Sequence, residues 1–312
     1  MLIATHLAGF GAFTESAAGG GAIGRALFMG GNTGATNATI DFVAIDTTGN
    51  ATDFGDLTSA RDGIAAMASD TRGISYGGSS TNTIEYVTVA STGNATDFGD
   101  ATQNLQWSSG ASSQTRGLCL DATAGADYQR IEYITIATLG NGTDFGGTSV
   151  FVKDSSGACA SPTRALHMGG ANATATPQNV IDYVTIASLG NATYFGDLTA
   201  ARALVASMSS DVRGLCGGGY DSSFLSANVI DYVTIASTGN ATDFGDLTSI
   251  RRSLGGASSL VRGLFGGGYN AVSINTIEYV TIGSTGNATD FGDLTVARYF
   301  VAGCSDSHGG LA

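Results

Sequence analysis

The sequence predicts an all-β fold, a six-bladed β-propeller with four antiparallel strands in each blade. One phrase, Gly-Asn-Ala-Thr-Asp-Phe-Gly-Asp-Leu, occurs six times with small changes along the 312 residues. Its phenylalanines are 44 to 50 residues apart, a spacing typical of propeller blades and too long for ankyrin or leucine-rich repeats. The 47 glycines and two prolines suit many short strands joined by tight turns. The phenylalanines are Phe54, Phe98, Phe145, Phe195, Phe244 and Phe291.

Each repeat predicts four strands, which we name a to d. In the fifth copy they cover residues 202–208, 213–219, 230–236 and 241–247. Strand c is rich in β-branched and aromatic residues, which fit a pleated, half-buried surface. It is followed by Ser-Thr-Gly-Asn, a turn that suits a hairpin between strands c and d.

The two ends of the chain predict how the ring closes. Residues 298–312 align without a gap on residues 202–216, so they supply a strand a and the start of a strand b. The N-terminal side enters at Arg25 with a complete strand b, and we expect the first blade to take its innermost strand from the other end of the chain. Such closure hides open sheet edges. We therefore expect one propeller domain, residues 25–312, preceded by residues 1–24 as an N-terminal arm or extra strand with a Gly-rich linker.

Loop lengths indicate where a binding surface lies. The strand c acid and the strand d Phe are always 13 residues apart, whereas the distance from the strand b Arg to the strand c acid runs from 13 to 18. In an up-and-down blade the b–c and d–a loops emerge on the same face, which we call the variable face. Function usually resides on loops held by a rigid scaffold.

Large aromatic and basic residues of these loops are the candidate contact residues, because such side chains anchor interfaces. Two of them, Trp107 and Phe151, lie where a strand a begins, so burial between blades is the alternative for them. The full set is Trp107, Tyr128, Arg130, Phe151, Lys153, Tyr220, Phe224 and Tyr269.

Charge argues against nucleic acid as a partner. The net charge is −13, and most of the 13 basic residues recur at fixed positions of the repeat, which leaves no basic patch. We expect these arginines to form ion pairs with the repeated acids of strands c and d. They are Arg25, Arg72, Arg116, Arg164, Arg213 and Arg262 in strand b, and Arg61, Arg202, Arg251 and Arg298 at the end of the d–a segment.

The cysteines and histidines predict no metal, cofactor or disulfide. Cys119 and Cys216 in strand b, and Cys159 and Cys304 in strand a, stand where other blades have apolar residues, so we interpret them as small buried hydrophobic residues. The three histidines have no ligand spacing, and His167 replaces an apolar strand b residue. No hydrophobic run is long enough to cross a membrane, and no signal peptide is recognisable.

Two short motifs are better explained by the fold than by chemistry. Asp-Phe-Gly matches the magnesium-binding triplet of protein kinases, but it recurs in five copies without a His-Arg-Asp loop, so we interpret it as part of strand d. Asn-Ala-Thr would accept a glycan in a secretory pathway, and in this repeat it forms part of a turn. Near-identical blades also argue against catalysis, because a catalytic site needs one blade to differ in its polar residues.

The repeat resembles a known blade type. Its order of Arg, Gly-Gly, an acidic-aromatic strand such as Ile277-Glu-Tyr-Val and the segment ending at Arg298 resembles the kelch blade, with Phe where kelch usually has Trp. The consensus phrase Ile-Glu-Tyr-Val-Thr-Ile-Ala-Ser-Thr-Gly-Asn-Ala-Thr-Asp-Phe-Gly-Asp-Leu resembles repeats of virion structural proteins of marine bacteriophages, cyanophages in particular. The resemblance covers about residues 25 to 312. It implies a virion setting and marks no catalytic residue.

These observations together predict a non-enzymatic structural or binding module of a phage virion, displayed on a tail, fibre or capsid surface. Its expected partners are other virion proteins, a host cell-surface glycan or protein, or further copies of the chain in the particle, with no nucleic acid and no membrane insertion. The expected location is the virion, after synthesis in the host cytoplasm and release by lysis. Two alternatives stay open: a purely architectural decoration protein, and a carbohydrate-active enzyme with paired carboxylates.

Overall fold

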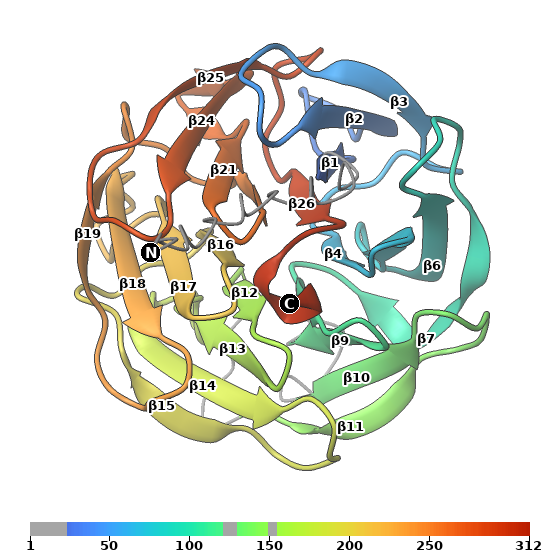
Figure 1. Cartoon of the computed structure of the whole chain (residues 1–312), viewed down its shortest axis with the longest axis horizontal. Helices are drawn as coiled ribbons and strands as arrows, with labels where there is room; N and C mark the ends of the chain where they lie inside the picture. Colours follow the sequence, from blue (N-terminus) through green and yellow to red (C-terminus); the bar gives the residue numbers. More distant parts are fainter. Residues whose placement is uncertain (1–23, 121–129, 149–154) are drawn as a thin grey trace, which may run out of the picture.

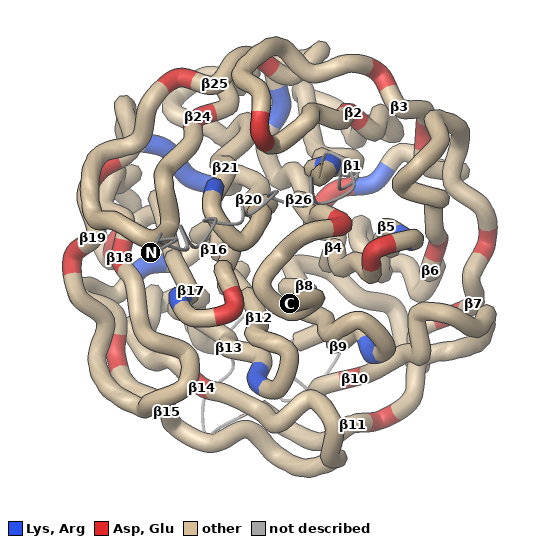
Figure 2. The backbone as a smooth tube through the Cα atoms, viewed as in Figure 1, with Lys and Arg blue, Asp and Glu red and all other residues tan. Residues whose placement is uncertain are grey.

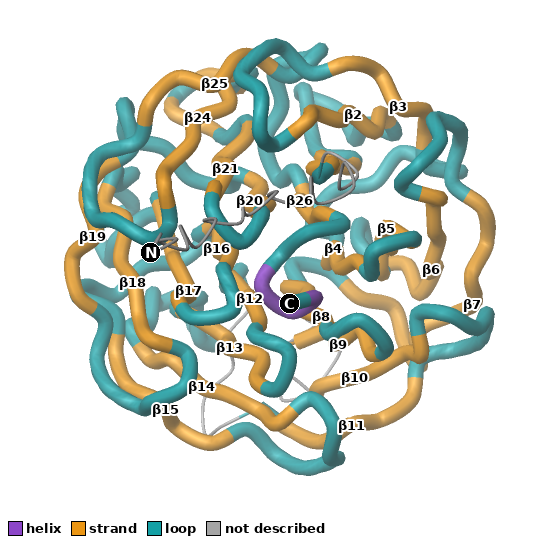
Figure 3. Tube along the Cα trace, viewed as in Figure 1, coloured by secondary structure: helices purple, strands orange, loops and turns teal. Residues whose placement is uncertain are grey.

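The computed structural model describes residues 24–120, 130–148 and 155–312, and these form six four-stranded antiparallel sheets. The sheets are arranged as blades around a central axis (Figure 1). In each blade strand a lies at the axis and strand d at the rim, and loops join the strands (Figure 3). The predicted six-bladed propeller is confirmed. The expected N-terminal arm lies almost wholly outside the described residues.

The blades are numbered in chain order, and each runs outward from strand a at the axis to strand d at the rim. Blade 1 has β26 (Ala302–Ser305), β1 (Arg25–Met29), β2 (Thr39–Ala44) and β3 (Thr52–Asp56). Blade 2 has β4 (Ala65–Ala68), β5 (Arg72–Tyr76), β6 (Thr81–Thr88) and β7 (Thr96–Leu105). Blade 3 has β8 (Ser109–Ser112), β9 (Arg116–Leu120), β10 (Arg130–Thr135) and β11 (Thr143–Gly147). Blade 4 has β12 (Gly157–Ala160), β13 (Arg164–Met168), β14 (Val180–Thr185) and β15 (Thr193–Asp197). Blade 5 has β16 (Ala206–Ser209), β17 (Arg213–Gly217), β18 (Val229–Thr234) and β19 (Thr242–Asp246). Blade 6 has β20 (Gly255–Ser258), β21 (Arg262–Gly266), β24 (Thr276–Thr281) and β25 (Thr289–Asp293). A short hairpin, β22 (Tyr269–Asn270) and β23 (Val272–Ser273), and the 3₁₀ helix η1 (Gly309–Leu311) complete the described elements.

Blade 1 closes the ring with strands from both sides of the sequence. β26 pairs antiparallel with β1, so that Ala26 lies opposite Ser305 and Met29 opposite Ala302. The Asp306 carboxylate accepts a hydrogen bond from the Arg25 main-chain N–H at 2.7 Å. The predicted closure is confirmed, and it leaves blade 1 with the same four strands as the others.

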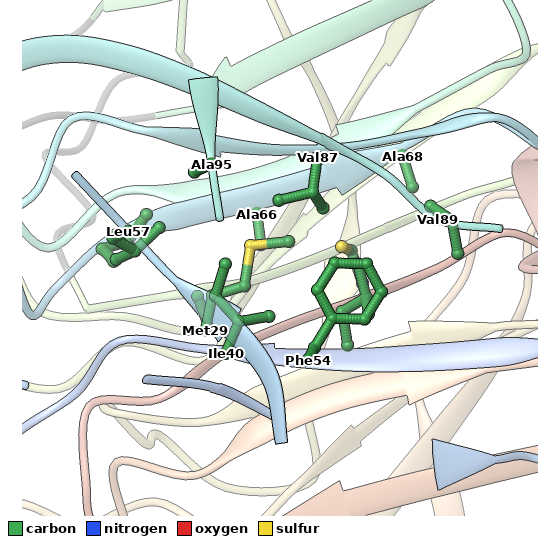
Figure 4. Packing of buried hydrophobic residues seen from close by; sticks show 13 residues of the cluster. Met29, Ile40, Phe54, Leu57, Ala66, Ala68, Val87, Val89 and Ala95 are labelled. Carbon is green, nitrogen blue, oxygen red and sulfur yellow. The ribbon is translucent and has the colours of Figure 1, made fainter. Parts of the chain in front are cut away.

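The hydrophobic core lies between neighbouring blades. Between blades 1 and 2, for example, Met29 and Ile40 of one blade pack with Val87 and Val89 of the next (Figure 4). The phenylalanine of each repeated phrase is at most 3% exposed. It packs edge to face on the strand c aromatic residue of its own blade. Burying such a ring contributes about 1.5 to 3 kcal/mol, which accounts for its presence in every copy.

Among the described residues, a buried ion pair in four blades ties the d–a segment that enters the blade to strand c of that blade. Arg202, at the end of the segment that enters blade 5, lies 2.6 Å from the Asp231 carboxylate of strand c, and both side chains are almost fully buried. The Thr199 hydroxyl donates to the same carboxylate at 2.6 Å. Equivalent pairs join Arg61 to Glu85, Arg251 to Glu278 and Arg298 to Asp41. For these arginines the predicted pairing with the strand c acids is confirmed.

Among the described residues, the strand b arginines form no ion pair with the repeated acids, contrary to the prediction. Arg213 lies over the Tyr232 ring, 4.8 Å from its centroid, and donates to the Ile282 carbonyl of the next blade at 3.1 Å. The register explains this, because Arg213 lies opposite Thr234 whereas the acid Asp231 lies opposite Cys216, about 10 Å along the strand. The acids of strand d lie on the outer rim of the ring (Figure 2).

The predicted Gly-Asn turn also holds neighbouring blades together. The Asn240 side chain accepts a hydrogen bond from the Asp197 main-chain N–H of the preceding blade at 3.1 Å, and the equivalent asparagines do the same around the rim. Gly245 adopts φ 146°, and a Cβ there would lie 2.5 Å from the Gly286 carbonyl. Glycine is therefore required where strand d meets the next turn.

Two smaller expectations can be compared with the structure. Strand a of blade 5 begins at Ala206 rather than at Arg202, because Arg202 forms the buried ion pair and Leu204 takes a left-handed backbone conformation with φ 55°.

All four cysteines are buried, as predicted, and burial raises the pKa of the Cys159 thiol to about 12. In the described part of the chain, no helix has the length and hydropathy needed to cross a membrane.

Candidate functional site

Six residues with a left-handed backbone conformation surround the axis on the variable face, and each lies just before a strand a. Five of them donate a main-chain N–H to the carbonyl of the equivalent residue in the preceding blade, for example Leu204 to Ser155 at 2.7 Å and Phe300 to Ser253 at 2.7 Å. We call this set the mouth ring. Its members are Gly63, Trp107, Ser155, Leu204, Ser253 and Phe300, with φ between 54° and 62°.

The mouth ring combines a repeated backbone with unlike side chains. A left-handed conformation costs a residue other than glycine about 1 kcal/mol or more, and Gly63 shows that glycine occupies one of these positions. The backbone hydrogen bonds therefore do not explain why Trp107, Leu204 and Phe300 are large. Strained residues of this kind are a reason to look for function nearby.

An aromatic pocket of about 400 Å³ opens beside the mouth ring. It is formed by the b–c loops of blades 5 and 6 and by the d–a segments that enter blades 5, 6 and 1. This volume falls within the range of small-ligand pockets. The residues that line it are Leu204, Tyr220, Phe224, Arg252, Ser253, Tyr269, Tyr299 and Phe300.

Main-chain bridges fix the position of the pocket walls. Ala203 and Tyr220 exchange two hydrogen bonds at 3.1 and 2.9 Å, and Arg252 and Tyr269 exchange two at 3.2 and 2.8 Å. Each bridge joins a d–a segment to the b–c loop that it crosses. The Gly-Gly after strand b permits this crossing, since Gly219 has φ 96° and a Cβ there would lie 2.7 Å from the Ala203 carbonyl.

The aromatic rings form an almost continuous arc around the pocket. Tyr220 and Phe224 stack with their planes 10° apart and their centroids at 5.4 Å. Tyr269 lies 5.2 Å from Tyr299, whose centroid is 4.8 Å from that of Phe300. Phe300 in turn contacts Trp107 edge to face at 4.2 Å, which extends the arc into the mouth ring.

Arg252 places a positive charge in this arc. Its guanidinium carbon lies 5.7 Å from the centroid of the Tyr220 ring and 5.5 Å from that of Tyr269. Such cation–π contacts hold a guanidinium without neutralising it. One of its N–H groups donates to the Phe224 carbonyl at 3.1 Å, which fixes its orientation further.

The rim of the pocket exposes large apolar side chains. Phe224 and Leu225 are 63% and 66% exposed at the tip of one b–c loop, and Val272 is 67% exposed at the tip of the next. Phe224 also has a left-handed backbone, with φ 61°. Clustered apolar exposure beside a pocket is typical of an interaction site.

The structure brings together some of the candidate contact residues predicted from the sequence. Tyr220, Phe224 and Tyr269 line the aromatic pocket, and Trp107 adjoins it through Phe300. Trp107 is half-buried in the mouth ring, where strand a is approached. Tyr128, Phe151 and Lys153 lie outside the described residues.

Arg130 lies apart from the pocket, on β10 of blade 3. Its Nε atom is 3.3 Å from the Glu132 carboxylate and 3.8 Å from that of Asp144. In this blade Leu105 takes the place that Arg61 has in the preceding d–a segment. The Tyr76 hydroxyl donates to Glu132 at 2.6 Å, so Tyr76 and Arg130 together replace the missing arginine.

Five pocket residues were not predicted: Leu204, Arg252, Ser253, Tyr299 and Phe300. Their signal lay in the alignment of the d–a segments, where Arg202, Arg251 and Arg298 are followed by Ala-Leu, Arg-Ser and Tyr-Phe. The residues after the arginine differ between blades although the arginine itself is repeated. Those two positions are the bridge residue and the mouth-ring residue.

Strand a of every blade lines a space along the axis, which we call the axial channel, and His308 lies at its end opposite the mouth ring. η1 lies at the centre of the ring, and His308 precedes it (Figure 1). The His308 Nε2 atom is 3.0 Å from the Ala68 carbonyl, and its Nδ1 accepts from the Gly310 N–H at 3.1 Å. Burial lowers the pKa of His308 to about 4, so the ring is neutral near pH 7.

His167 behaves as the buried residue that the sequence predicted. It is fully buried in β13, and its Nε2 lies 2.5 Å from the Ser156 hydroxyl. Within the described residues, no three His, Cys, Asp or Glu side chains are grouped so that they could hold a metal ion.

A comparison of the sequence with protein-family models found no match, and a search of curated proteins found no significantly similar sequence.

Proposed function

We propose that this chain is a non-enzymatic binding module of a phage virion, and that it contacts the host cell surface through the aromatic pocket of its variable face. The phage setting rests on the resemblance of the repeat to virion proteins. The binding role rests on one observation: the residues that depart from the repeat gather into a pocket with exposed apolar rims.

The repeated and the non-repeated residues have different roles, and this difference supports the proposed function. Repeated residues are used to build the ring, since the d–a arginines, the strand d phenylalanines and the turn asparagines all bond or pack between strands and blades. The side chains of Phe224, Arg252 and Tyr299 have no such repeated role, although the main chain of Arg252 and Tyr299 forms the bridge. Tyrosine, tryptophan and arginine are the residues that most often carry the binding energy of an interface.

The test measures binding of the labelled full-length protein to a panel of candidate host cells. We expect saturable binding that the double substitution Phe224→Ala and Tyr269→Ala removes. Tyr194→Ala is the matched control, because Tyr194 is also an exposed aromatic residue, 53% exposed, but lies on β15 at the rim. Binding that survives the pocket substitution, or that is lost equally in the control, would contradict the proposal.

The position of the chain in the particle separates recognition from architecture. Electron microscopy of the virion should find the variable face directed outward, with the pocket open to solvent. A pocket covered by a neighbouring virion protein would instead indicate the architectural role. A hydrolysis product from a panel of cell-surface glycans would indicate an enzyme.

A further inference from the structure

We propose that the aromatic pocket binds a saccharide that carries a carboxylate, and that Arg252 receives this carboxylate. This inference rests on the proposed function and narrows its partner to acidic cell-surface polysaccharide. Three features of the pocket support it: the unused donors of Arg252, the paired main chain of the walls, and the aromatic faces with their hydroxyl groups.

Arg252 is a cation that the fold does not need. The neighbouring Arg251 is fully buried against Glu278, whereas Arg252 is half-buried in the pocket. Ala203 and Tyr299 make the equivalent bridge in other blades without a positive charge. In the described part of the chain no carboxylate lies within ion-pair distance of Arg252, although the net charge of the protein is −13.

The guanidinium is oriented and keeps donors for a ligand. It is held between Tyr220 and Tyr269, and one of its five N–H groups bonds to the Phe224 carbonyl. A fixed planar guanidinium binds a carboxylate through two parallel hydrogen bonds. A ligand carboxylate is therefore the group that complements this end of the pocket.

The walls favour a sugar over an extended peptide. A peptide that adds a strand needs unpaired main-chain groups. In this pocket the N–H and carbonyl groups of Arg252 bond to Tyr269, and the N–H groups of Ser253 and Phe300 bond within the mouth ring. What the pocket offers instead is aromatic faces for the apolar face of a pyranose, with Tyr and Ser hydroxyls at their edges.

The test uses surface polysaccharide purified from a cell type that the protein binds, either native or after its carboxylates have been reduced to alcohols. We expect the native polysaccharide to bind at least about tenfold more tightly than the reduced one. Arg252→Gln should lose this difference, binding the native form about as weakly as the reduced form, and Arg252→Lys should recover part of it. Unchanged thermal unfolding of both variants shows that the ring is intact.

Other results separate the inference from the function on which it rests. Equal binding of native and reduced polysaccharide, or an equal loss for both with Arg252→Gln, overturns the role of the carboxylate. Pocket-dependent binding to cells but not to their polysaccharide overturns the saccharide and leaves the binding function standing. An absence of pocket-dependent binding to any cell type overturns the proposed function, and this inference with it.

Discussion

Lowering the pH should reduce the free energy of unfolding of the protein because of His308. The imidazole of this residue is neutral in the folded state and lies at the end of the axial channel opposite the mouth ring. The pKa of this histidine is about 4 in the folded state and 6.5 in the unfolded chain. The unfolded state therefore binds more protons between these values, so the contribution of His308 to stability is complete above pH 6.5 and declines as the pH falls to about 4.

The size of the effect follows from the shift. A difference of about 2.5 pKa units corresponds to about 3 kcal/mol at 1.36 kcal/mol per unit. This value is an upper bound, because the side chain keeps some solvent exposure that screens the charge. Burial of the imidazole is the main cause of the lowered pKa, because it disfavours the charged ring. In addition, Nδ1 accepts the Gly310 N–H, and a proton on Nδ1 would end that bond.

The assay compares urea unfolding at pH 7 and pH 4 for the natural chain and for His308→Asn, in which the side-chain oxygen can still cap Gly310. The comparison also cancels Asp306, whose pKa burial raises and which therefore loses stability in the opposite direction, as the pH rises. We expect the natural chain to lose up to about 3 kcal/mol more than the variant. Equal losses, or an NMR titration of His308 near pH 6.5, would refute the reasoning.

Three further predictions about the ring are tested by chemical denaturation. Arg202→Met should cost about 3 to 5 kcal/mol, because it leaves the Asp231 charge buried without its partner, and adding Asp231→Asn should recover part of the loss; a cost below about 1 kcal/mol would contradict the buried pair. Asn240→Ala should cost about 1 kcal/mol through the lost hydrogen bond to Asp197, and unchanged stability would show that this hydrogen bond contributes nothing. At Leu204, which is left-handed, glycine should change stability by less than about 1 kcal/mol and valine should cost more; the reverse order would argue against the strain.

The architecture could be predicted from the sequence because each copy of the repeat has the same residue types at the same spacing. The fixed distance of 13 residues between the strand c acid and the strand d Phe reflects one hairpin used in every blade. The roles of the arginines were harder to predict. Whether Arg213 or Arg202 reaches Asp231 depends on the strand register and on the path of the d–a segment, which charge pattern alone does not specify.

The candidate site was predicted in part for a similar reason. Unequal b–c loops marked Tyr220 and Phe224, because loop length is visible in the sequence. Arg252 and Phe300 lie in segments of constant length, beside repeated arginines, and their positions depend on a left-handed turn. Large residues such as phenylalanine ordinarily avoid that conformation, so nothing in their identity signals it.

In the mouth ring the main chain holds the structure together, and the side chains alone determine the surface that is presented. Its hydrogen bonds run between main-chain atoms, so they are indifferent to which side chain each blade presents. Exchanging residues at Trp107, Leu204 or Phe300 thus changes the surface around the axis while the five main-chain hydrogen bonds beneath it persist. The six positions can therefore change their side chains on a common backbone. Under the proposed function, related chains with other residues at these positions would keep the fold and bind different partners.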